Sequence, residues 1–189
     1  MMPVLIALIV LVGLPLLYAL VQYNGLVALR NYMRESWSDV DVELKRRYDL
    51  IPNLVAVVKG YAAHERAVFE RVAELRNRCA ANNGPVADQS RDEVQLVDAL
   101  KQMLAVVENY PQLKADQQFL KLQTELVNTE DRIQAARRFY NGNVRDYRNK
   151  CETFPSNLVA GLFGFKAEGD FFSVPPSVQN VPNVDFATS

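Results

Sequence analysis

Hydrophobic residues follow two different patterns along this chain, a continuous run near the N-terminus and a seven-residue repeat after it. The run reads PVLIALIVLVGLPLLYALV over residues 3–21, and no charged side chain occurs before Arg30. From Tyr23 onward the apolar positions recur in alternating steps of three and four, which places them on one face of an α-helix. The sequence therefore predicts an all-α protein, in which an N-terminal transmembrane helix is followed by a long antiparallel up-down four-helix bundle.

The apolar run has the length and composition of a membrane-spanning helix. About 20 apolar residues in a helix cross the hydrocarbon core of a bilayer, and Gly13 and Pro15 are tolerated inside such a helix. A cleaved signal peptide is the alternative, but such peptides begin with basic residues and have a shorter apolar core. We therefore expect residues 1–22 to be an uncleaved, single-pass anchor in the cell (inner) membrane. The anchor side chains are Pro3, Val4, Leu5, Ile6, Leu8, Ile9, Leu11, Leu14, Leu16, Leu17, Leu20 and Val21.

The heptad positions of the predicted bundle domain, residues 23–153, fall into four stretches. They lie between residues 23 and 51, 54 and 79, 97 and 107, and 119 and 147. The turn-forming sequence Asn82–Pro85 separates the second stretch from the third.

Two prolines mark expected helix starts. Asp49 precedes Pro52 by three residues and Asn109 precedes Pro111 by two, so each polar residue is a candidate N-cap with proline in the first helical turn. The heptad phase continues unbroken through Pro52, however, and a kinked continuous helix is the alternative there.

An even number of antiparallel helices returns the chain to the membrane, where the apolar segment 154–172 would follow. It begins FPSNLVAGLFGF, which is rich in glycine and phenylalanine and poor in charge. This segment would pack on the base of the bundle, lie on the bilayer or bind a partner, with Phe163 and Phe165 as candidate contacts. The remaining residues, 173–189, contain three prolines and no heptads, so they are predicted to form a flexible tail.

The balance of charges limits the possible partners. The chain carries 21 Lys+Arg and 22 Asp+Glu, for a formal net charge of −1, and the two signs are interspersed. Because there is no basic block to neutralise phosphates, nucleic acid is not an expected partner. Arg30 and Arg34 follow the apolar run, so the positive-inside rule favours a bundle on the cytoplasmic side.

Residues that commonly carry catalysis or metal binding are few and are not spaced as a site. His64 is the only histidine, and Cys79 and Cys151 form neither a CxxC nor a Cys/His pattern, so no metal or cofactor is expected. The sequence lacks HExxH, GxSxG, GxGxxG and P-loop motifs, and we do not expect an enzyme. We interpret the two cysteines as small side chains at helix ends, with a disulfide as the alternative in an oxidising compartment.

Five charged residues occupy or border the apolar lines of the predicted helices. They are Arg47, Glu65, Glu130, Arg132 and Arg137. A buried carboxylate needs a partner, and we expect an interhelical ion network that fixes helix register. Arg47 would lie ~20 Å from Glu65 along the bundle axis. Arg132 or Arg137 is therefore the expected partner of that carboxylate.

Five sequence blocks follow one another along the first 165 residues. They are YNGLV (23–27), RRYDLIPNLVAVVKGYAAHE (46–65), ENYPQLKADQQFLKLQTELVNTEDRI (108–133), ARRFYNGNVRDY (136–147) and FPSNLVAGLFGF (154–165). In this order and spacing they resemble the LemA family of small membrane-anchored proteins. The resemblance implies a short N-terminal membrane segment, an antiparallel helical bundle and no established enzymatic activity. The positions that match the family pattern include Tyr23, Asn24, Pro52, Asn53, His64, Tyr140 and Asn141.

An anchor and a helical body without a catalytic motif suggest a role in assembly. We expect a non-enzymatic scaffold or adaptor that acts through protein–protein contacts at the bacterial cell membrane. Its partners would be the lipid bilayer, and a second copy of the chain, another membrane protein or both. One alternative is an accessory regulator of membrane-protein and envelope quality control. A second is a small-ligand-binding bundle that uses His64, Glu65 and Arg137.

Overall fold

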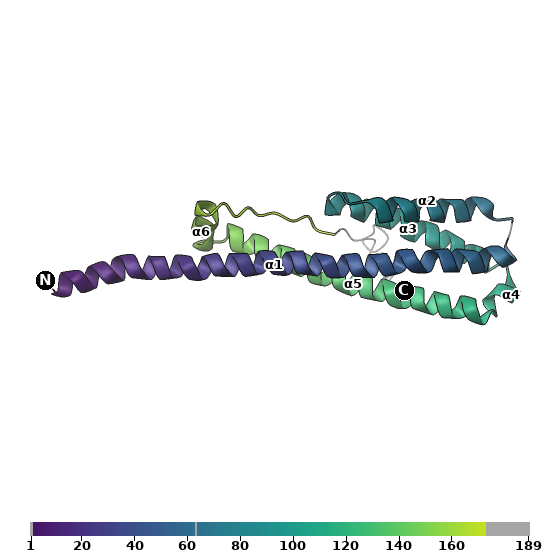
Figure 1. The fold of residues 1–189 in the computed structure, drawn as a ribbon, viewed down its shortest axis with the longest axis horizontal. Coiled ribbons are helices and arrows are strands. Elements are labelled where there is room, and N and C mark those ends of the chain that lie inside the picture. Colours follow the sequence, from purple (N-terminus) through teal and green to yellow (C-terminus); the bar gives the residue numbers. More distant parts are fainter. Residues whose placement is uncertain (1, 63, 173–189) are drawn as a thin grey trace, which may run out of the picture. The chain divides into compact units, whose positions relative to one another are not determined.

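The computed structural model describes residues 2–62 and 64–172, and the regular structure within these residues is entirely helical (Figure 1). The prediction of an all-α protein with a long apolar N-terminal helix is confirmed. The helices are α1 (Met2–Tyr61), α2 (Arg66–Ala81), α3 (Val86–Val107), α4 (Pro111–Lys114), α5 (Gln117–Glu152) and α6 (Ser156–Leu162).

These helices are distributed over two compact units. Unit 1 contains Met1–Arg47 and Glu125–Phe171, and thus the first part of α1, most of α5, and α6. Unit 2 is built on Tyr48–Thr124, which covers the end of α1, the helices α2 to α4 and the first turns of α5. Each unit has buried apolar side chains of its own.

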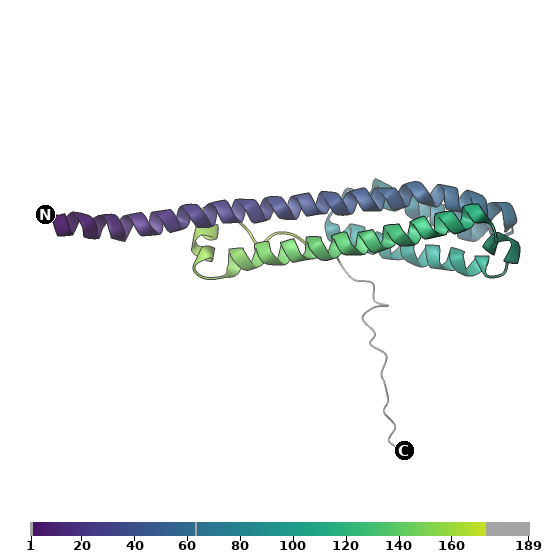
Figure 2. The same cartoon turned by 90° about the horizontal axis from the view of Figure 1, so that it is seen from below.

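In unit 1, α1 and α5 lie side by side in antiparallel orientation (Figure 2). The rings of Trp37 and Tyr140 have centroids 5.2 Å apart. Further along α1, Arg47 contacts Glu130 at 2.7 Å. Residue numbers therefore rise along α1 as they fall along α5.

Most positions on the predicted heptad lines of α1 and α5 are buried or half-buried, whereas Tyr23 is exposed. Leu26 and Val40 on α1 are completely covered, as expected for their line. Ile133, Tyr140 and Tyr147 on α5 are covered as well. The sequence pattern thus identified the contact faces of both helices, because burial on a helix follows its 3.6-residue period.

The longest helix continues through Pro52, so the expectation of an N-cap at Asp49 is wrong and the continuous-helix alternative is right. Proline has no N–H, and inside a helix it leaves the carbonyl four residues earlier without its donor. That carbonyl belongs to the buried residue Tyr48, and the Nε–H of Arg76 on α2 donates to it at 3.0 Å. The side chain of Arg76 therefore replaces the hydrogen bond that Pro52 cannot make.

The predicted second helix, residues 54–79, is divided in the structure. Its first part belongs to α1, which ends at Tyr61, and α2 begins only at Arg66. The intervening backbone turns through hydrogen bonds from the N–H of Ala62 to the carbonyl of Val58 and from the N–H of Glu65 to the carbonyl of Ala62, at 3.0 and 3.1 Å. The break takes about one helical turn of chain, so the heptad phase is the same on both sides of it.

The loop predicted between the second and third helices is present between α2 and α3. The N–H of Gly84 donates to the side-chain oxygen of Asn82 at 2.8 Å, which closes a tight turn. The amide of Asn82 also donates to Asp92 of α3 at 2.8 Å. The loop is therefore tied to the helix that follows it.

Two helix starts after α3 differ in detail from the expectation. Tyr110 and not Asn109 occupies the N-cap position before Pro111, which is the first residue of the single-turn helix α4. Asp116 precedes α5 and accepts the N–H of Phe119 at 2.8 Å. This backbone hydrogen bond lowers the pKa of the Asp116 carboxyl from its ordinary value, as expected for an N-cap.

After α6 the chain turns at residues 163–164 and then runs as an extended strap, residues 165–171, along the helices of unit 1 (Figure 1). The hydroxyl of Tyr140 donates to the carbonyl of Asp170 at 3.1 Å. Gly169 has φ of 103°, and a Cβ atom placed on it would lie 2.8 Å from the sulfur of Met33 and 3.4 Å from Val144. Only glycine therefore allows the strap to approach α1 and α5 this closely. The predicted tail, residues 173–189, lies outside the described residues.

Arg76→Met is expected to lower the free energy of unfolding by about 1–2 kcal/mol, because the buried carbonyl of Tyr48 loses its donor. In a Pro52→Ala background the restored N–H of residue 52 satisfies that carbonyl, so Arg76→Met should cost clearly less. Urea unfolding followed by circular dichroism measures both differences.

The matched control for this cycle is Arg71→Met, which removes an exposed pair with Glu74 on the same helix. It should be close to neutral in either background. An equal cost of Arg76→Met with proline and with alanine at position 52 would contradict the proposed replacement.

Gly169→Ala is expected to lower the free energy of unfolding by about 1–3 kcal/mol, because the new Cβ meets Met33 in a backbone conformation that alanine avoids. Gly161→Ala on α6 is the control, since a Cβ there meets no atom within 4 Å. That control should raise stability by up to about 1 kcal/mol through helix propensity. Thermal unfolding distinguishes the two, and similar effects of both replacements would count against the close approach of the strap.

Candidate functional site

Arg47 is a fully buried charge in unit 1, with 1 % of its side chain exposed. It ends the heptad line that begins at Leu26, so the periodicity of α1 itself directs the guanidinium toward α5. Its Nη1 donates to Oε2 of Glu130 at 2.7 Å, and the Glu130 side chain is 29 % exposed. A charge at this depth is tolerated only while its partner remains in place.

A second, weaker ion pair joins the same two helices. Glu43 on α1 contacts Arg46 of its own helix at 3.5 Å and Arg132 of α5 at 3.8 Å. The Arg132 side chain is exposed, so this contact is worth far less than the buried one. The contact between Glu43 and Arg132 is nevertheless compatible with the same alignment of α1 and α5 as the Arg47–Glu130 pair.

Arg137 completes the charged cluster of unit 1. Burial lowers the pKa of its guanidinium, the negative charge of Glu130 opposes that shift, and the positive charge of Arg47 adds to it. Four of the five predicted network residues, namely Arg47, Glu130, Arg132 and Arg137, thus belong to one stretch of the α1–α5 pair. Ion pairs of Glu130 with Arg47 and of Glu43 with Arg132 therefore connect α1 and α5, and the fixing of helix register by this network stays a prediction.

The fifth predicted network residue, Glu65, does not lie on a helical stripe. It stands at the N-cap position of α2, half-buried, and the neighbouring His64 is exposed in the same connection. Both belong to unit 2, whereas Arg137 belongs to unit 1. The pairing of Glu65 with Arg132 or Arg137 stays a prediction, as does a ligand site that combines His64 and Glu65 with Arg137.

The sequence analysis missed a second buried polar pair, in unit 2. The hydroxyl of Tyr48 on α1 donates to the carboxylate of Glu93 on α3, and both side chains are buried. A signal for it was present, because a step of seven back from the buried Leu100 reaches Glu93. The predicted third stretch began only at Val97, and so the carboxylate on its line was overlooked.

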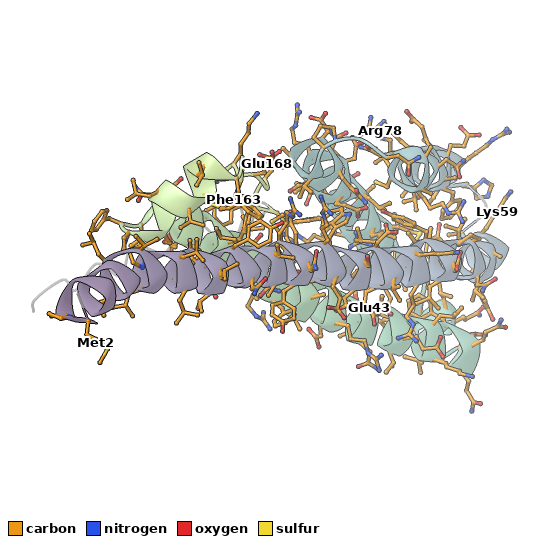
Figure 3. The ribbon with its side chains drawn as sticks, turned by 60° about the vertical axis from the view of Figure 1, so that its left-hand side comes forward. Met2, Glu43, Lys59, Arg78, Phe163 and Glu168 are labelled. Atoms are coloured by element: carbon orange, nitrogen blue, oxygen red, sulfur yellow. The ribbon has the colours of Figure 1, made fainter. Side chains whose placement is uncertain are left out.

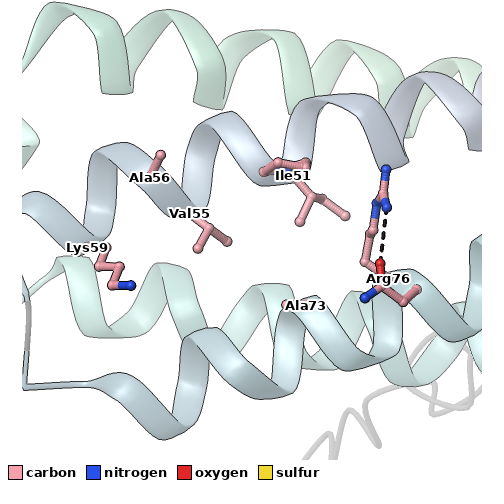
Figure 4. A pocket seen from close by; sticks show the side chains of 8 residues that line it. Ile51, Val55, Ala56, Lys59, Ala73 and Arg76 are labelled. Carbon is pink, nitrogen blue, oxygen red and sulfur yellow. Dashed lines mark hydrogen bonds between the residues drawn. The ribbon is translucent and has the colours of Figure 1, made fainter.

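An open groove of about 340 Å³ lies between the end of α1 and α2 (Figure 4). Its apolar lining consists of Ile51, Val55, Ala56 and Ala73 (Figure 4). Arg76 also lines the groove, and its Nη1 donates to the side-chain oxygen of Asn77 at 3.1 Å (Figure 4). Pro52, Lys59 and Asn77 complete the lining. A shallow groove of small apolar residues suits contact with another surface better than the enclosure of a small molecule.

Within residues 2–62 and 64–172, no three histidine, cysteine or acidic side chains lie close enough together to hold a metal ion. Cys79 and Cys151 are both buried as thiols. Burial raises the pKa of the Cys151 thiol above its ordinary value, which makes it a weak nucleophile.

The apolar run occupies the first turns of α1 and is poorly covered by the rest of unit 1. Among the described residues, this is the one helix that is long and apolar enough to cross a membrane by length and composition, with a mean hydropathy of 1.6 in its most apolar window. The predicted anchor side chains that are exposed in the structure are Pro3, Leu11, Leu14, Leu16, Leu17, Leu20 and Val21. Side chains at positions 4–9 lie outside the described part of the structure.

The two predicted contact phenylalanines lie at the end of this run and differ in exposure. Phe163 is 53 % exposed and its ring stands edge-on to that of Tyr23, with centroids 4.9 Å apart. Phe165 is only 9 % exposed and packs between Tyr23 and the guanidinium of Arg30. Phe165 thus belongs to the core of unit 1, and Phe163 remains available for an outward contact.

Comparison with known protein families shows which family this chain belongs to. The sequence model of the LemA family matches residues 36–186, which is most of the chain. The protein belongs to the LemA family. The match includes the charged cluster of unit 1, residues 48–124 of unit 2 and α6, so the family resemblance extends over the helical body.

Several curated relatives accompany this match. Magnetosome protein MamQ 2 of Paramagnetospirillum magneticum is 26% identical over 183 residues, which cover 84% of this chain and 67% of that protein. Magnetosome protein MamQ of Magnetospirillum gryphiswaldense is 24% identical over 181 residues, covering 82% and 66%. Protein LemA of Metamycoplasma hominis is 28% identical over 139 residues, covering 72% and 63%. The chain therefore spans about two thirds of the length of these LemA-family relatives.

The LemA-pattern positions are spread over both units. In unit 1, Tyr23 and Asn24 stand near the end of the apolar run, and Tyr140 is buried against Trp37 with Asn141 beside it. In unit 2, Pro52 lies within α1 and the exposed Asn53 lines a second open groove. Of these positions, Tyr140 packs in the core of unit 1 and Asn53 borders a groove of unit 2.

Glu130→Ala is expected to lower the free energy of unfolding by about 2–4 kcal/mol, because Arg47 would remain buried without its carboxylate. Glu43→Ala, which removes a more exposed pair in the same helix interface, should cost less than about 1 kcal/mol. Urea unfolding of the full chain in detergent measures both.

Replacing both partners tests the cause of that loss. Arg47→Met combined with Glu130→Leu should recover most of the stability, since the fully buried guanidinium is removed together with its carboxylate. If Glu130→Ala changed stability by less than about 0.5 kcal/mol, the pair would be a passive surface contact rather than a structural one.

Proposed function

We propose that this LemA-family protein is a single-pass, membrane-anchored scaffold or adaptor that acts through protein–protein contacts rather than catalysis. The observation that carries the proposal is the exposed apolar run on α1, which passes without interruption into the helical body. A surface of this size and composition is stable when lipid covers it. The helical body is thereby held at the membrane.

The interior of the body supports a role in assembly. Its buried charged groups have partners: Arg47 forms an ion pair with Glu130 in unit 1, and Glu93 accepts a hydrogen bond from the hydroxyl of Tyr48 in unit 2. Such pairs give each helix contact a defined register. We include an up-down four-helix bundle and self-association in this proposal, supported by the antiparallel pairing of α1 with α5 and by the open grooves of unit 2.

The names of the relatives point the same way. MamQ proteins are named after the magnetosome, a cell structure, and not after a reaction. Names that refer to a cell structure are consistent with the proposed scaffold role of this chain.

The full-length chain is expected to remain in the membrane fraction after a carbonate or high-salt wash. Replacing Leu14 and Leu17 together by Asp should release most of it, because each charge in the span disfavours insertion by about 3 kcal/mol. Val42→Asp combined with Val127→Asp is the matched control, since both are exposed apolar residues of the body, and it should not change the extraction. Release of the unchanged chain by carbonate would refute the anchor.

The side of the membrane is measured with an introduced thiol, because Cys79 is only 1 % exposed and would react slowly on either side. Asn83→Cys places a thiol in the exposed α2–α3 loop. We expect a membrane-impermeant maleimide to label it only after the cells are permeabilised, as the positive-inside rule favours a cytoplasmic body.

Amine-reactive crosslinking of the same membranes should give species above the monomer mass, and recovery of the monomer alone would argue against a scaffold.

A further inference from the structure

We propose that α6 is a second membrane contact of this protein, and that its outward apolar face lies in the headgroup region of the same bilayer that holds α1. The inference rests on the proposed membrane anchor. It adds to that anchor a short helix from the far end of the sequence, which α5 returns to the apolar part of α1 (Figure 2).

The outward face of α6 is apolar and strongly exposed. Leu158 and Leu162 stand one helical turn apart and are 64 % and 79 % exposed, and Phe154 and Phe163 flank them. The chain between Glu152 and Lys166 carries no charged side chain. Such a face on an isolated water-soluble helix would be a liability for aggregation, whereas a lipid interface accommodates it.

The inward face of α6 packs on the anchor end of α1. Val159 and Ala160 belong to a buried cluster with Leu26 of α1, and Tyr18 and Ala19 pack against the same cluster. Figure 3 shows Phe163 beside the α1 ribbon, on the side of Met2 relative to Glu43. The position of α6 along α1 is therefore set by contacts on both sides of Tyr23.

This position determines the depth of α6 in a membrane. The first charged residue of α1 is Arg30, and Tyr23 lies seven residues before it, which is ~10 Å along the helix axis. Tyr18 lies ~8 Å deeper still. If the apolar run crosses the bilayer, α6 therefore sits between the level of the first charge and the hydrocarbon, where tyrosine and other aromatic rings concentrate.

Basic groups border α6 on the side of the body. Arg30 stands 5.1 Å from the centre of the Phe165 ring, and Lys166 follows that ring in the sequence. A Cβ atom on Gly25 would lie 3.8 Å from the Lys150 side chain, so this ammonium-bearing chain reaches the same level of α1. Cations just above an apolar face match a lipid headgroup layer, with phosphates above and acyl chains below.

Contact quenching by brominated lipids tests the depth directly. The full-length chain with Trp37→Phe and Leu162→Trp is reconstituted in phosphatidylcholine vesicles that carry bromine on the upper acyl carbons. We expect roughly a twofold loss of indole fluorescence relative to unbrominated vesicles, because the ring would touch the acyl region near the headgroups.

Two further variants in the same background make the outcome decisive. Phe139→Trp places the indole on an exposed aromatic position of α5 beside the Trp37 level, ~20 Å from the level of Tyr23, and should not be quenched. Leu14→Trp places it within the span, and lipids with bromine deep in the chain should quench it. Quenching of Leu14→Trp without quenching of Leu162→Trp overturns the α6 contact and leaves the anchor intact. No quenching of Leu14→Trp overturns both.

A second measurement keeps Trp37, so that a change in its packing against Tyr140 cannot affect the outcome. A nitroxide on Leu162→Cys, with Trp37 retained and Cys79 and Cys151 changed to Ala, should be more accessible to oxygen than to a polar nickel complex. The same label on Phe139→Cys should show the reverse order. Equal accessibilities at both positions, or a label at position 162 shielded from both reagents by a second chain, would contradict the lipid contact.

Discussion

The hydrogen bond from Arg76 to the carbonyl of Tyr48 allows α1 to continue past Pro52. Without it, a buried acceptor would stand without a donor in the middle of the helix, a loss comparable to the net value of several surface contacts. The apolar phase of α1 therefore runs from the anchor to Tyr61 in one helix. The same Arg76 side chain also lines the groove of unit 2, beside Pro52.

In unit 1 a buried ion pair bears on the register of α1 against α5. A heptad stripe of aliphatic residues tolerates a shift by one turn, because one apolar layer can replace another. The pair formed by Arg47 and Glu130 does not tolerate it, since a shift would leave a guanidinium buried among apolar side chains. The buried ion pair thus favours one register of α1 against α5 over its alternatives.

Local pattern predicted much of this fold, and the parts that it missed depend on contacts distant in sequence. Leu26 and Val40 were predicted as core because burial follows helix periodicity. The course of α1 through Pro52 was left open, since only a residue of α2 decides it. The break before Glu65 was missed because about one turn of chain preserves the phase, and Glu93 was missed because its stretch was begun too late. The approach of Gly169 to α1 leaves no periodic signal at all.

The two buried cysteines make local opening of each unit measurable by thiol modification. Cys79 lies in unit 2 and Cys151 in unit 1, and both are shielded from solvent. A thiol reagent in excess can modify either one only when the surrounding helices open, so the rate of modification reports the free energy of local opening. Because the two residues report on different units, peptide mapping of the modified chain would show whether the two units open together or independently.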